Sequence, residues 1–344
     1  MPNYSEVKEE TMAEYKGVLV CGESADGKLA SITTELLGCG RKLADDLKED
    51  LSCLLASDRV GEASKEAIAF GADKVHAVEH PALKEYEADS YMQVVGRLVR
   101  DVSPRVILLG QTSMGRDLAP RLAFRLGTSV TTDCLNLSID PATKLLVQTR
   151  PVYGGNAQAV FISESMPQMV TVRAKAMSPL ERNASRKGEV IPTKIDIDAS
   201  KVRTKVLETV KEEAVGIKLE DAPVIVSGGR GMGGPQPFQT MLKELADLLH
   251  GAVGASRPPA DNGWVAEHLH IGLTGKIVAP DIYIAIAISG ASQHTAGCSG
   301  SKHIIAINKD PEANIFREAQ FGVVGKYEDV LPAFTSKLKQ LLAA

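Results

Sequence analysis

The sequence lacks the features that mark several large classes of proteins. Its five cysteines are scattered and form no CxxC pair, which disfavours structural zinc, an iron–sulfur cluster and a disulfide framework, and fits a reducing cytosol. Aromatic residues make up only 4% of the chain, which argues against a base-stacking platform for nucleic acid. A net charge of −4 implies no polyanionic partner. We therefore expect a cytoplasmic protein with no metal site and no nucleic-acid partner.

Long apolar runs are missing as well. No run approaches the ~20 residues that a membrane helix requires, so membrane insertion is not expected. Residues 1–15 are mostly charged and polar, without the apolar segment of a signal peptide, and we expect a flexible tail there. Hydrophobic residues nevertheless make up 44% of the 344 residues, enough for a substantial core. A chain of this length usually folds into two domains.

Short apolar runs alternate with amphipathic segments in the first half of the chain. The runs are typical of buried parallel strands, and the segments between them have helical spacing. This alternation predicts an N-terminal α/β domain, 16–205, with helices on both faces of a parallel sheet. The expected strands are 17–22, 51–56, 74–78 and 105–110, the expected helices are 32–47, 62–70, 90–101 and 118–126, and short strands at 145–148, 159–162 and 169–173 are expected to extend the sheet.

A charged stretch, 205–220, separates the two halves and predicts a linker near 200–215. The second domain, 206–344, repeats the α/β pattern. Its glycine-rich turn, 228–234, has neither the GxGxxG spacing nor a Walker lysine, so it is a weak signal by itself. The expected strands are 223–227, 252–256, 282–288, 303–307 and 322–324, and the expected helices are 238–249, 312–319 and 327–342.

Several polar turns in the second domain follow apolar strands. In a parallel sheet the carboxyl ends of all strands lie at one edge, where open α/β sheets bind ligands. The small residues of loop 289–300 suit a phosphate or a cofactor diphosphate, while Gln293 and His294 add groups that a bare phosphate does not need. The turns, 227–234, 254–257, 271–276, 289–300 and 308–310, can converge on one elongated ligand, larger than a mononucleotide.

At these turns the sequence closely resembles the α subunit of electron transfer flavoproteins. The matching motifs are SGGRG (227–231), GASR (254–257), TGKIVAP (274–280), ISGASQH (288–294) and AINKDPEANIF (306–316), together with GRDLAPRLA (115–123), QTRPVYGGN (148–156) and PQMVTVR (167–173). The resemblance covers essentially the whole chain past residue 15. The N-terminal motifs are more similar to anaerobic bacterial members than to mitochondrial ones.

The resemblance implies two Rossmann-like domains with mainly parallel sheets. The N-terminal one would have a nucleotide-hydrolase-like fold that faces a partner, and the C-terminal one would bind FAD. It also implies a heterodimer with a β subunit, and an electron carrier rather than a stand-alone enzyme, with no catalytic residue of its own. The carrier would move electrons between NADH or dehydrogenases and an acyl-CoA dehydrogenase, an acyl-CoA reductase or a quinone-linked acceptor. Splitting of electrons to ferredoxin would depend on the β subunit.

Site roles carry over by position. Arg230 and Ser256 would lie near the dinucleotide, Arg257 against the isoalloxazine, Thr274 at flavin N5 and His294 at flavin O2 and N1. The 289–293 loop would wrap the diphosphate and ribityl chain, with Asn308 on the adenosine side. The expected cofactor-binding residues are Arg230, Ser256, Arg257, Ile271, Gly272, Leu273, Thr274, Ser289, Gly290, Ala291, Ser292, Gln293, His294, Asn308, Lys326 and Tyr327.

The resemblance also carries a redox expectation. A cation or donor near N1 and O2 stabilises the negative charge of reduced flavin. Arg257 is charged at any working pH, whereas His294 would gain a charge only at low pH. Two residues depart from the family pattern. Leu273 replaces a common glutamine, and Lys326 replaces an acidic residue at the adenosine end.

Two other function classes remain open on the residues alone. One is a regulatory nucleotide-binding module without redox activity. The other is a small-molecule hydrolase or ligase that uses Thr274 or Ser289, although SGASQ is not a GxSxG elbow. Cys298 is expected to be a small buried thiol, since no matched His/Asp pair accompanies it. His268, His270 and His303 are expected to be ordinary histidines without a role in the site.

Overall fold

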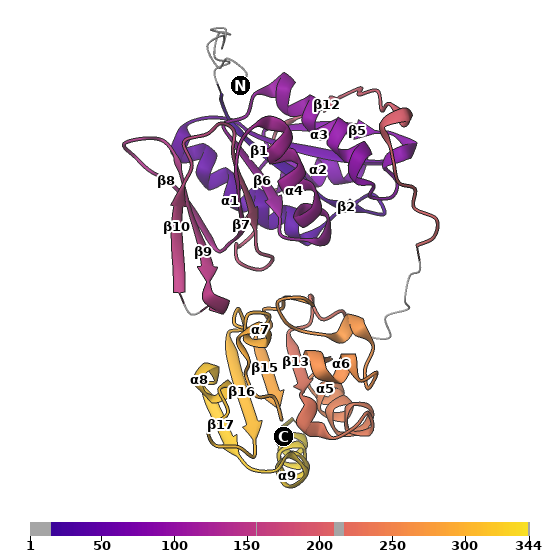
Figure 1. Ribbon diagram of the computed structural model, residues 1–344, viewed down its shortest axis with the longest axis vertical. Helices are drawn as coiled ribbons and strands as arrows, with labels where there is room; N and C mark the ends of the chain where they lie inside the picture. Colours follow the sequence, from indigo (N-terminus) through magenta and orange to yellow (C-terminus); the bar gives the residue numbers. More distant parts are fainter. Residues whose placement is uncertain (1–14, 156, 210–216, 343–344) are drawn as a thin grey trace, which may run out of the picture. The chain divides into compact units, whose positions relative to one another are not determined.

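The computed structural model describes residues 15–155, 157–209 and 217–342. The chain divides into two compact units: residues up to 209 without 153–157, and residues 153–157 with those from 210 onward. We describe each unit by itself (Figure 1). The expected tail, apart from Tyr15, and the C-terminal part of the expected linker, 210–215, lie outside the described residues.

The first unit is built on a seven-stranded parallel sheet in the order β12-β5-β4-β1-β6-β11-β7. β1 lies in its centre, with β4 on one side and β6 on the other. The sheet therefore has the reversal of strand order that is typical of a Rossmann-like fold. The strands are β1 (Val18–Gly22), β4 (Leu51–Ser57), β5 (Lys74–Glu79), β6 (Val106–Gly110), β7 (Val130–Cys134), β11 (Gln168–Val172) and β12 (Glu189–Pro192).

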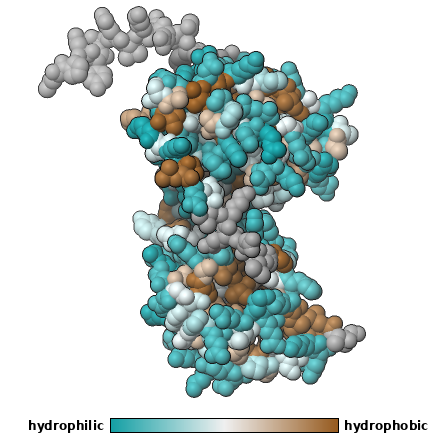
Figure 2. Space-filling model, turned by 90° about the vertical axis from the view of Figure 1, so that its right-hand side faces the viewer, coloured by the Kyte–Doolittle hydropathy of each residue, from teal (hydrophilic) through white to brown (hydrophobic). Residues whose placement is uncertain are grey.

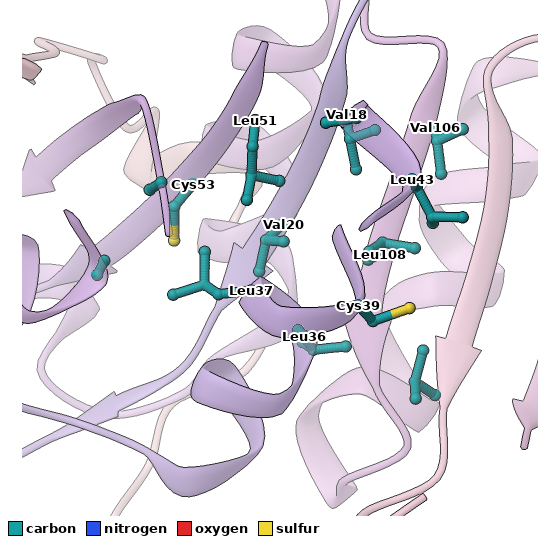
Figure 3. Packing of buried hydrophobic residues seen from close by; sticks show 14 of the residues in the cluster. Val18, Val20, Leu36, Leu37, Cys39, Leu43, Leu51, Cys53, Val106 and Leu108 are labelled. Atoms are coloured by element: carbon teal, nitrogen blue, oxygen red, sulfur yellow. The ribbon is translucent and has the colours of Figure 1, made fainter. Parts of the chain in front are cut away.

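Helices cover both faces of this sheet, as the alternation of the sequence predicts. Val18 and Val20 of β1 pack in the cluster that contains α1 and α2, whereas Leu19 and Cys21 pack in the cluster that contains α3 and α4. Figure 3 shows the first cluster, where side chains of α1 pack on β1, β4 and β6. The helices are α1 (Ser31–Leu47), α2 (Gly61–Ala69), α3 (Ala88–Val102) and α4 (Ser113–Leu126), with short 3-10 helices at Pro81–Leu83 and Ala199–Lys201.

The expectation that all later β-like runs extend the main sheet is partly wrong. β11 and β7 do extend it, but β8 (Asn136–Ile139), β9 (Leu146–Val152) and β10 (Ala157–Ile162) form a separate three-stranded sheet in which β8 and β9 are antiparallel. β10 has a mostly exposed pattern, although it carries Val160, Phe161 and Ile162, which are among the exposed large hydrophobic residues; its apolar sequence therefore does not place it in the buried main sheet. A two-stranded hairpin, β2 (Ser24–Ala25) and β3 (Lys28–Leu29), was also not expected.

The turn after β6 is an ordinary helix cap. The Thr112 hydroxyl oxygen accepts the Gly115 N–H at 3.1 Å. The same hydroxyl donates to Glu23 Oε1 at 2.6 Å. Glu23 follows β1, so its carboxylate fills the point at which the strand order of the first unit reverses. Burial raises the pKa of this carboxyl group, and the Thr112 hydrogen bond opposes that rise.

The second unit is a five-stranded parallel sheet in the order β14-β13-β15-β16-β17. One face packs in a cluster with Cys298 and Ile315, the other with the helices α5 and α9. The strands are β13 (Val224–Gly228), β14 (Ala252–Ala255), β15 (Ile282–Ile286), β16 (His303–Asn308) and β17 (Phe321–Val324). The two parallel sheets confirm the predicted fold class.

Short helices connect these strands. Pro258 and Pro259 lie in the first turn of a five-residue helix, a position with which proline is compatible. Part of the expected loop 289–300 is also helical. The helices are a π-helix (Phe238–Leu242), α5 (Lys243–Leu248), α6 (Arg257–Asp261), α7 (Ser292–Thr295), α8 (Ile315–Glu318) and α9 (Tyr327–Leu342), with 3-10 helices at Tyr153–Gly155, Arg230–Met232 and Glu267–Leu269.

Figure 2 colours one face of the molecule by residue hydropathy. On the face that Figure 2 shows, hydrophilic residues predominate and hydrophobic ones lie in small separate groups. Among the described residues, no helix is long and apolar enough to span a bilayer.

Candidate functional site

A cavity of about 680 Å³ lies at the carboxyl edge of the second sheet. Ligand pockets in proteins commonly have this size. The turns after β13, β14, β15 and β16 all contribute to its wall, because these strands are parallel and end at the same edge. The lining residues are Arg230, Gly231, Ser256, Arg257, Pro258, His270, Ile271, Thr274, Ala287, Ile288, Ser289, Ala291, Gln293, His294, Asn308, Asp310 and Ala313.

The strand order reverses beneath this cavity. β13 has β14 on one side and β15 on the other, so the turns after β13 and β15 diverge and leave a crevice between them. At the base of the crevice, where the two strands end, their backbones are still in contact: the Gly229 N–H donates to the Ile286 carbonyl at 2.9 Å, and a Cβ on Gly229 would overlap the Ala287 carbonyl. Glycine is therefore required at position 229 for the crevice to have this shape.

The loop after β15 is held in place by contacts with Ile315 and Asn308. Gly290 has a φ of +80°, and a Cβ there would overlap the backbone nitrogen of Ile315. The Ile315 N–H donates to the Ser289 carbonyl at 3.1 Å, and Asn308 Nδ2 donates to the Ile288 carbonyl at 2.8 Å. The loop that offers Ser289 and Gln293 to the cavity is thus held by both α8 and β16.

The turn that carries Thr274 is held against α7. The Leu273 N–H donates to the Gln293 carbonyl at 2.7 Å, and a Cβ on Gly297 would lie only 2.5 Å from the Cα of Gly272. The turn closes on itself, since the Gly272 N–H donates to the Lys276 carbonyl at 3.1 Å. The exposed Thr274 side chain therefore stands on a rigid base.

His294 on α7 is saturated with hydrogen bonds inside the protein. Its Nδ1 is 3.0 Å from the Ile271 carbonyl oxygen, which can only accept, so Nδ1 carries the proton. Its Nε2 is 3.0 Å from the hydroxyl of Tyr283, which donates to it. Burial lowers the pKa of His294 to about 4, and the Ile271 hydrogen bond only partly opposes this. A pKa this low leaves the imidazole neutral at pH 6 to 8, so a charge on His294 is expected only at lower pH.

Arg257 begins α6 and has a carboxylate partner. Its Nε lies 3.2 Å from Asp261 Oδ2, and both side chains are more than half exposed, at 64% and 60%. The preceding Ser256 is buried and also lines the cavity. An exposed arginine whose pair partner lies four residues away keeps most of its donors for a ligand.

Seven residues of the cavity wall were not among the expected site residues, and His270 is one of them; the seven are Gly231, Pro258, His270, Ala287, Ile288, Asp310 and Ala313. His270 was expected to be an ordinary histidine, but it lines the cavity beside Ile271 and Thr274. Burial lowers its pKa, with Arg257 acting in the same direction and Asp261 and Glu267 against it. Its neighbour His268, in contrast, is exposed and absent from the wall. The signal was available in principle, because His270 directly precedes the turn at Ile271.

The structure brings most of the expected site residues together. Gly272, Leu273, Gly290 and Ser292 belong to the same turns but do not line the cavity themselves. Lys326 and Tyr327 line an adjoining cavity of about 250 Å³, which shares Gly231, Ala287 and Asn308 with the main one. Those that line the main cavity are Arg230, Ser256, Arg257, Ile271, Thr274, Ser289, Ala291, Gln293, His294 and Asn308.

The hydrolase alternative has no support in this geometry. Cys298 is fully buried, and burial raises the pKa of its thiol to about 12, so it is a structural thiol, as expected. No histidine within the described ranges is hydrogen-bonded to the hydroxyl of Ser289 or Thr274. Those ranges also contain no cluster of three His, Cys, Asp or Glu side chains that could hold a metal ion.

The donor set fits a flavin dinucleotide. Two arginines and several hydroxyls suit a diphosphate, and Ile271, Ile288 and Ala287 supply apolar wall for a ring. The adjoining cavity lengthens the site beyond what a mononucleotide fills. A dinucleotide-sized cavity at the reversal point of a parallel sheet defines this unit as a dinucleotide-binding domain.

Comparison with known families specifies the class further. Residues 218–299 match the family model described as "Electron transfer flavoprotein FAD-binding domain", and residues 18–197 match the "Electron transfer flavoprotein domain". The chain therefore belongs to the alpha subunits of the electron transfer flavoprotein family, and the cofactor of its second unit is FAD. The predicted family and cofactor are confirmed.

Individual relatives match over nearly their whole length. An "Electron transfer flavoprotein subunit alpha" of Thermoanaerobacterium thermosaccharolyticum is 45% identical over 96% of this chain and 100% of its own. The protein of the same description in Megasphaera elsdenii is also 45% identical, over 96% and 98%. An "Acryloyl-CoA reductase electron transfer subunit beta" of Anaerotignum propionicum is 36% identical, over 95% and 96%.

Proposed function

We propose that this chain is the FAD-holding subunit of a two-subunit electron carrier, with a β subunit as its partner. It would take electrons from NADH or a dehydrogenase and deliver them to an acyl-CoA dehydrogenase or reductase, or to a quinone-linked acceptor. The main support is the cavity at the reversal point of the second sheet, whose lining matches a flavin dinucleotide. The similarity to a protein described as an acryloyl-CoA reductase electron transfer subunit favours an acyl-CoA acceptor.

We further propose how FAD lies in the site. Arg257, Thr274 and His294 would surround the isoalloxazine, and the 289–293 loop would hold the diphosphate. Arg230 and Ser256 would contact the dinucleotide between them, and Asn308 would meet the adenosine, with Lys326 and Tyr327 beyond it. When bound, FAD supplies reversible electron transfer. The chain supplies a cation at one ring edge and a fixed hydroxyl at another.

The proposal also assigns a separate role to each unit. Residues 16–205 would face the β subunit, and residues 206–344 would form the FAD-binding domain. The first unit would hold no nucleotide, because the Glu23 carboxylate occupies the position at which its strand order reverses. The five cysteines are all free and buried, which is consistent with a cytoplasmic location.

The test is co-expression of the chain with the β subunit encoded beside its gene. We expect a yellow complex in which the FAD of this chain is bound with 1:1 stoichiometry and is reduced by NADH or by a reduced acyl-CoA dehydrogenase. Arg257→Gln should weaken FAD binding or shift its absorption, whereas Arg317→Gln, at an exposed position of helix α8, should change neither. A complex that purifies without flavin but binds AMP or ATP tightly would establish a regulatory nucleotide-binding module instead.

A further inference from the structure

Two histidines line the same cavity, and they differ in what their ring nitrogens contact. Both nitrogens of His294 are used inside the protein, by the Ile271 carbonyl and the Tyr283 hydroxyl, each at 3.0 Å. The ring of His270 has no hydrogen-bond partner within the part of the chain that the structure describes. Of the two, His270 is therefore the one that can exchange a proton in response to a ligand.

The position of His270 is determined by the turn that carries Thr274. A Cβ on Gly275 would lie 2.7 Å from Nδ1 of His270, and a Cβ on Gly272 would lie 3.1 Å from Nε2. The imidazole thus lies directly on the turn, with no room for a side chain between them. His270 is only 8% exposed, and since it lines the cavity, its accessible surface faces the ligand beside Thr274.

Charged groups of both signs lie around His270. Helix α6 contributes Arg257 and Asp261, and the 3-10 helix before the turn contributes Glu267. From α7 comes His294, which is neutral, and Lys276 at the far end of the turn pairs with Glu220. Burial and Arg257 disfavour the imidazolium, whereas the two carboxylates favour it. A new negative charge in the cavity would shift this balance toward the protonated form.

We propose that His270 binds a proton when FAD is reduced, so that it couples electron uptake at this site to proton uptake from solvent. The electrons come from the reductant, either NADH through the complex or dithionite. The proton comes from water and forms an N–H bond with the unprotonated ring nitrogen of His270, with no bond to the cofactor made or broken. This inference rests on the proposed orientation of FAD, with the isoalloxazine at Arg257 and Thr274.

The direct test is a pH titration of the His270 ring resonances by NMR, in the FAD-loaded complex with the β subunit. Spectra are compared between the oxidised form and the form reduced by dithionite. An opposite charge within hydrogen-bonding range raises a histidine pKa by ~1 unit or more, so we expect proton binding to be about tenfold tighter after reduction. His250, an exposed histidine outside the cavity, should titrate identically in both forms. Identical titration of His270 in both forms would overturn the proposal.

A second test uses the flavin potential. The potential of the wild type should exceed that of His270→Gln increasingly as the pH falls from 8 to 5.5. A tenfold difference in proton affinity corresponds to a limiting gap of about 30 mV for a two-electron couple. His250→Gln should follow the wild type at every pH, and parallel curves for wild type and His270→Gln would refute the coupling.

The failure of this inference can be told from failure of the proposed function. If the wild type holds no FAD, or if Arg257→Gln leaves the potential unchanged, the proposed orientation is wrong. If FAD is bound and Arg257→Gln lowers its potential while His270 titrates alike in both redox forms, only the role of His270 is wrong. If His270→Gln does not fold, the NMR titration of the wild type decides alone.

Discussion

Arg257 and Asp261 form an ion pair at the proposed isoalloxazine end, and their removal should shift the flavin potential in opposite directions. Loss of the Arg257 cation removes a charge that stabilises reduced flavin, so Arg257→Gln should lower the potential. Loss of the Asp261 carboxylate removes an opposing charge and frees the guanidinium, so Asp261→Asn should raise it. The two substitutions change the same pair, yet the electrostatic argument gives them opposite signs.

The size of these shifts follows from the exposure of the pair. A charge-assisted hydrogen bond contributes about 1.5–3 kcal/mol. The Arg257 and Asp261 side chains are 64% and 60% exposed and 3.2 Å apart. Solvent screening and the Asp261 charge therefore reduce the effect of Arg257 on the flavin to the lower end of this energy range. An effect of about 1.4 kcal/mol equals about 30 mV for a two-electron couple. We therefore expect a fall of roughly 30 mV for Arg257→Gln, and a smaller rise for Asp261→Asn.

The assay is spectroelectrochemical titration of the FAD-loaded complex at pH 7.5, with Arg317→Gln as a control for the loss of an exposed arginine. Raising the salt concentration to about 1 M should reduce both shifts, because the Debye length falls to about 3 Å. Equal potentials in wild type and both variants at full FAD occupancy would refute the reasoning. So would two shifts of the same sign, because they would indicate a structural disturbance rather than a charge effect.

Three further predictions concern stability and the cofactor loop. Tyr283→Phe removes the donor to buried His294 and should cost about 1–3 kcal/mol in urea unfolding, with an altered 15N signature of the imidazole; an unchanged signature would show that Tyr283 does not set the tautomer. Gly290→Ala, at a φ of +80° against Ile315, should abolish or strongly weaken FAD binding, whereas Gly234→Ala, where a Cβ meets open space, should not. Burial raises the pKa of Glu35 from 4.5 to about 7, so the folded state binds the proton more tightly and the wild type loses stability as the pH rises between these values. Glu35→Gln lacks this loss, so its free energy of unfolding should exceed that of the wild type by up to ~3 kcal/mol at pH 8 but not at pH 4. A difference in unfolding free energy that does not change with pH would contradict this.

Local patterns were sufficient to predict most of the parallel architecture. The expected strand 105–110 and helix 32–47 differ from β6 and α1 by a single residue at one end, because apolar runs and helical spacing are properties of contiguous sequence. The sheet to which β8, β9 and β10 belong was harder to predict from the sequence. Whether a β-like run joins the main sheet or forms its own depends on which partner strands are available elsewhere in the fold, and the apolar residues Val160, Phe161 and Ile162 of β10 stay exposed.

The site was predictable in its outline but not in its hydrogen bonds. The turns could be assigned to one edge because parallel strands end together. The neutrality of His294, however, depends on Tyr283 and on the Ile271 carbonyl 23 residues away. The exposure of His270 to the cavity depends on two glycines that let the turn fold back onto its ring. Such contacts are made between elements, so no sequence window contains them.

The buried thiols give the protein an internal set of unfolding reporters. Cys39, Cys53 and Cys134 lie in one cluster of the first unit and Cys21 in the other, whereas Cys298 lies in the second unit. All five are buried, and burial raises the pKa of each thiol, so alkylating reagents cannot reach or activate them in the folded state. Mass spectrometry of timed alkylation would therefore measure how often each unit opens. Modification of Cys298 would report the opening of the flavin-binding unit, and no engineered label is required.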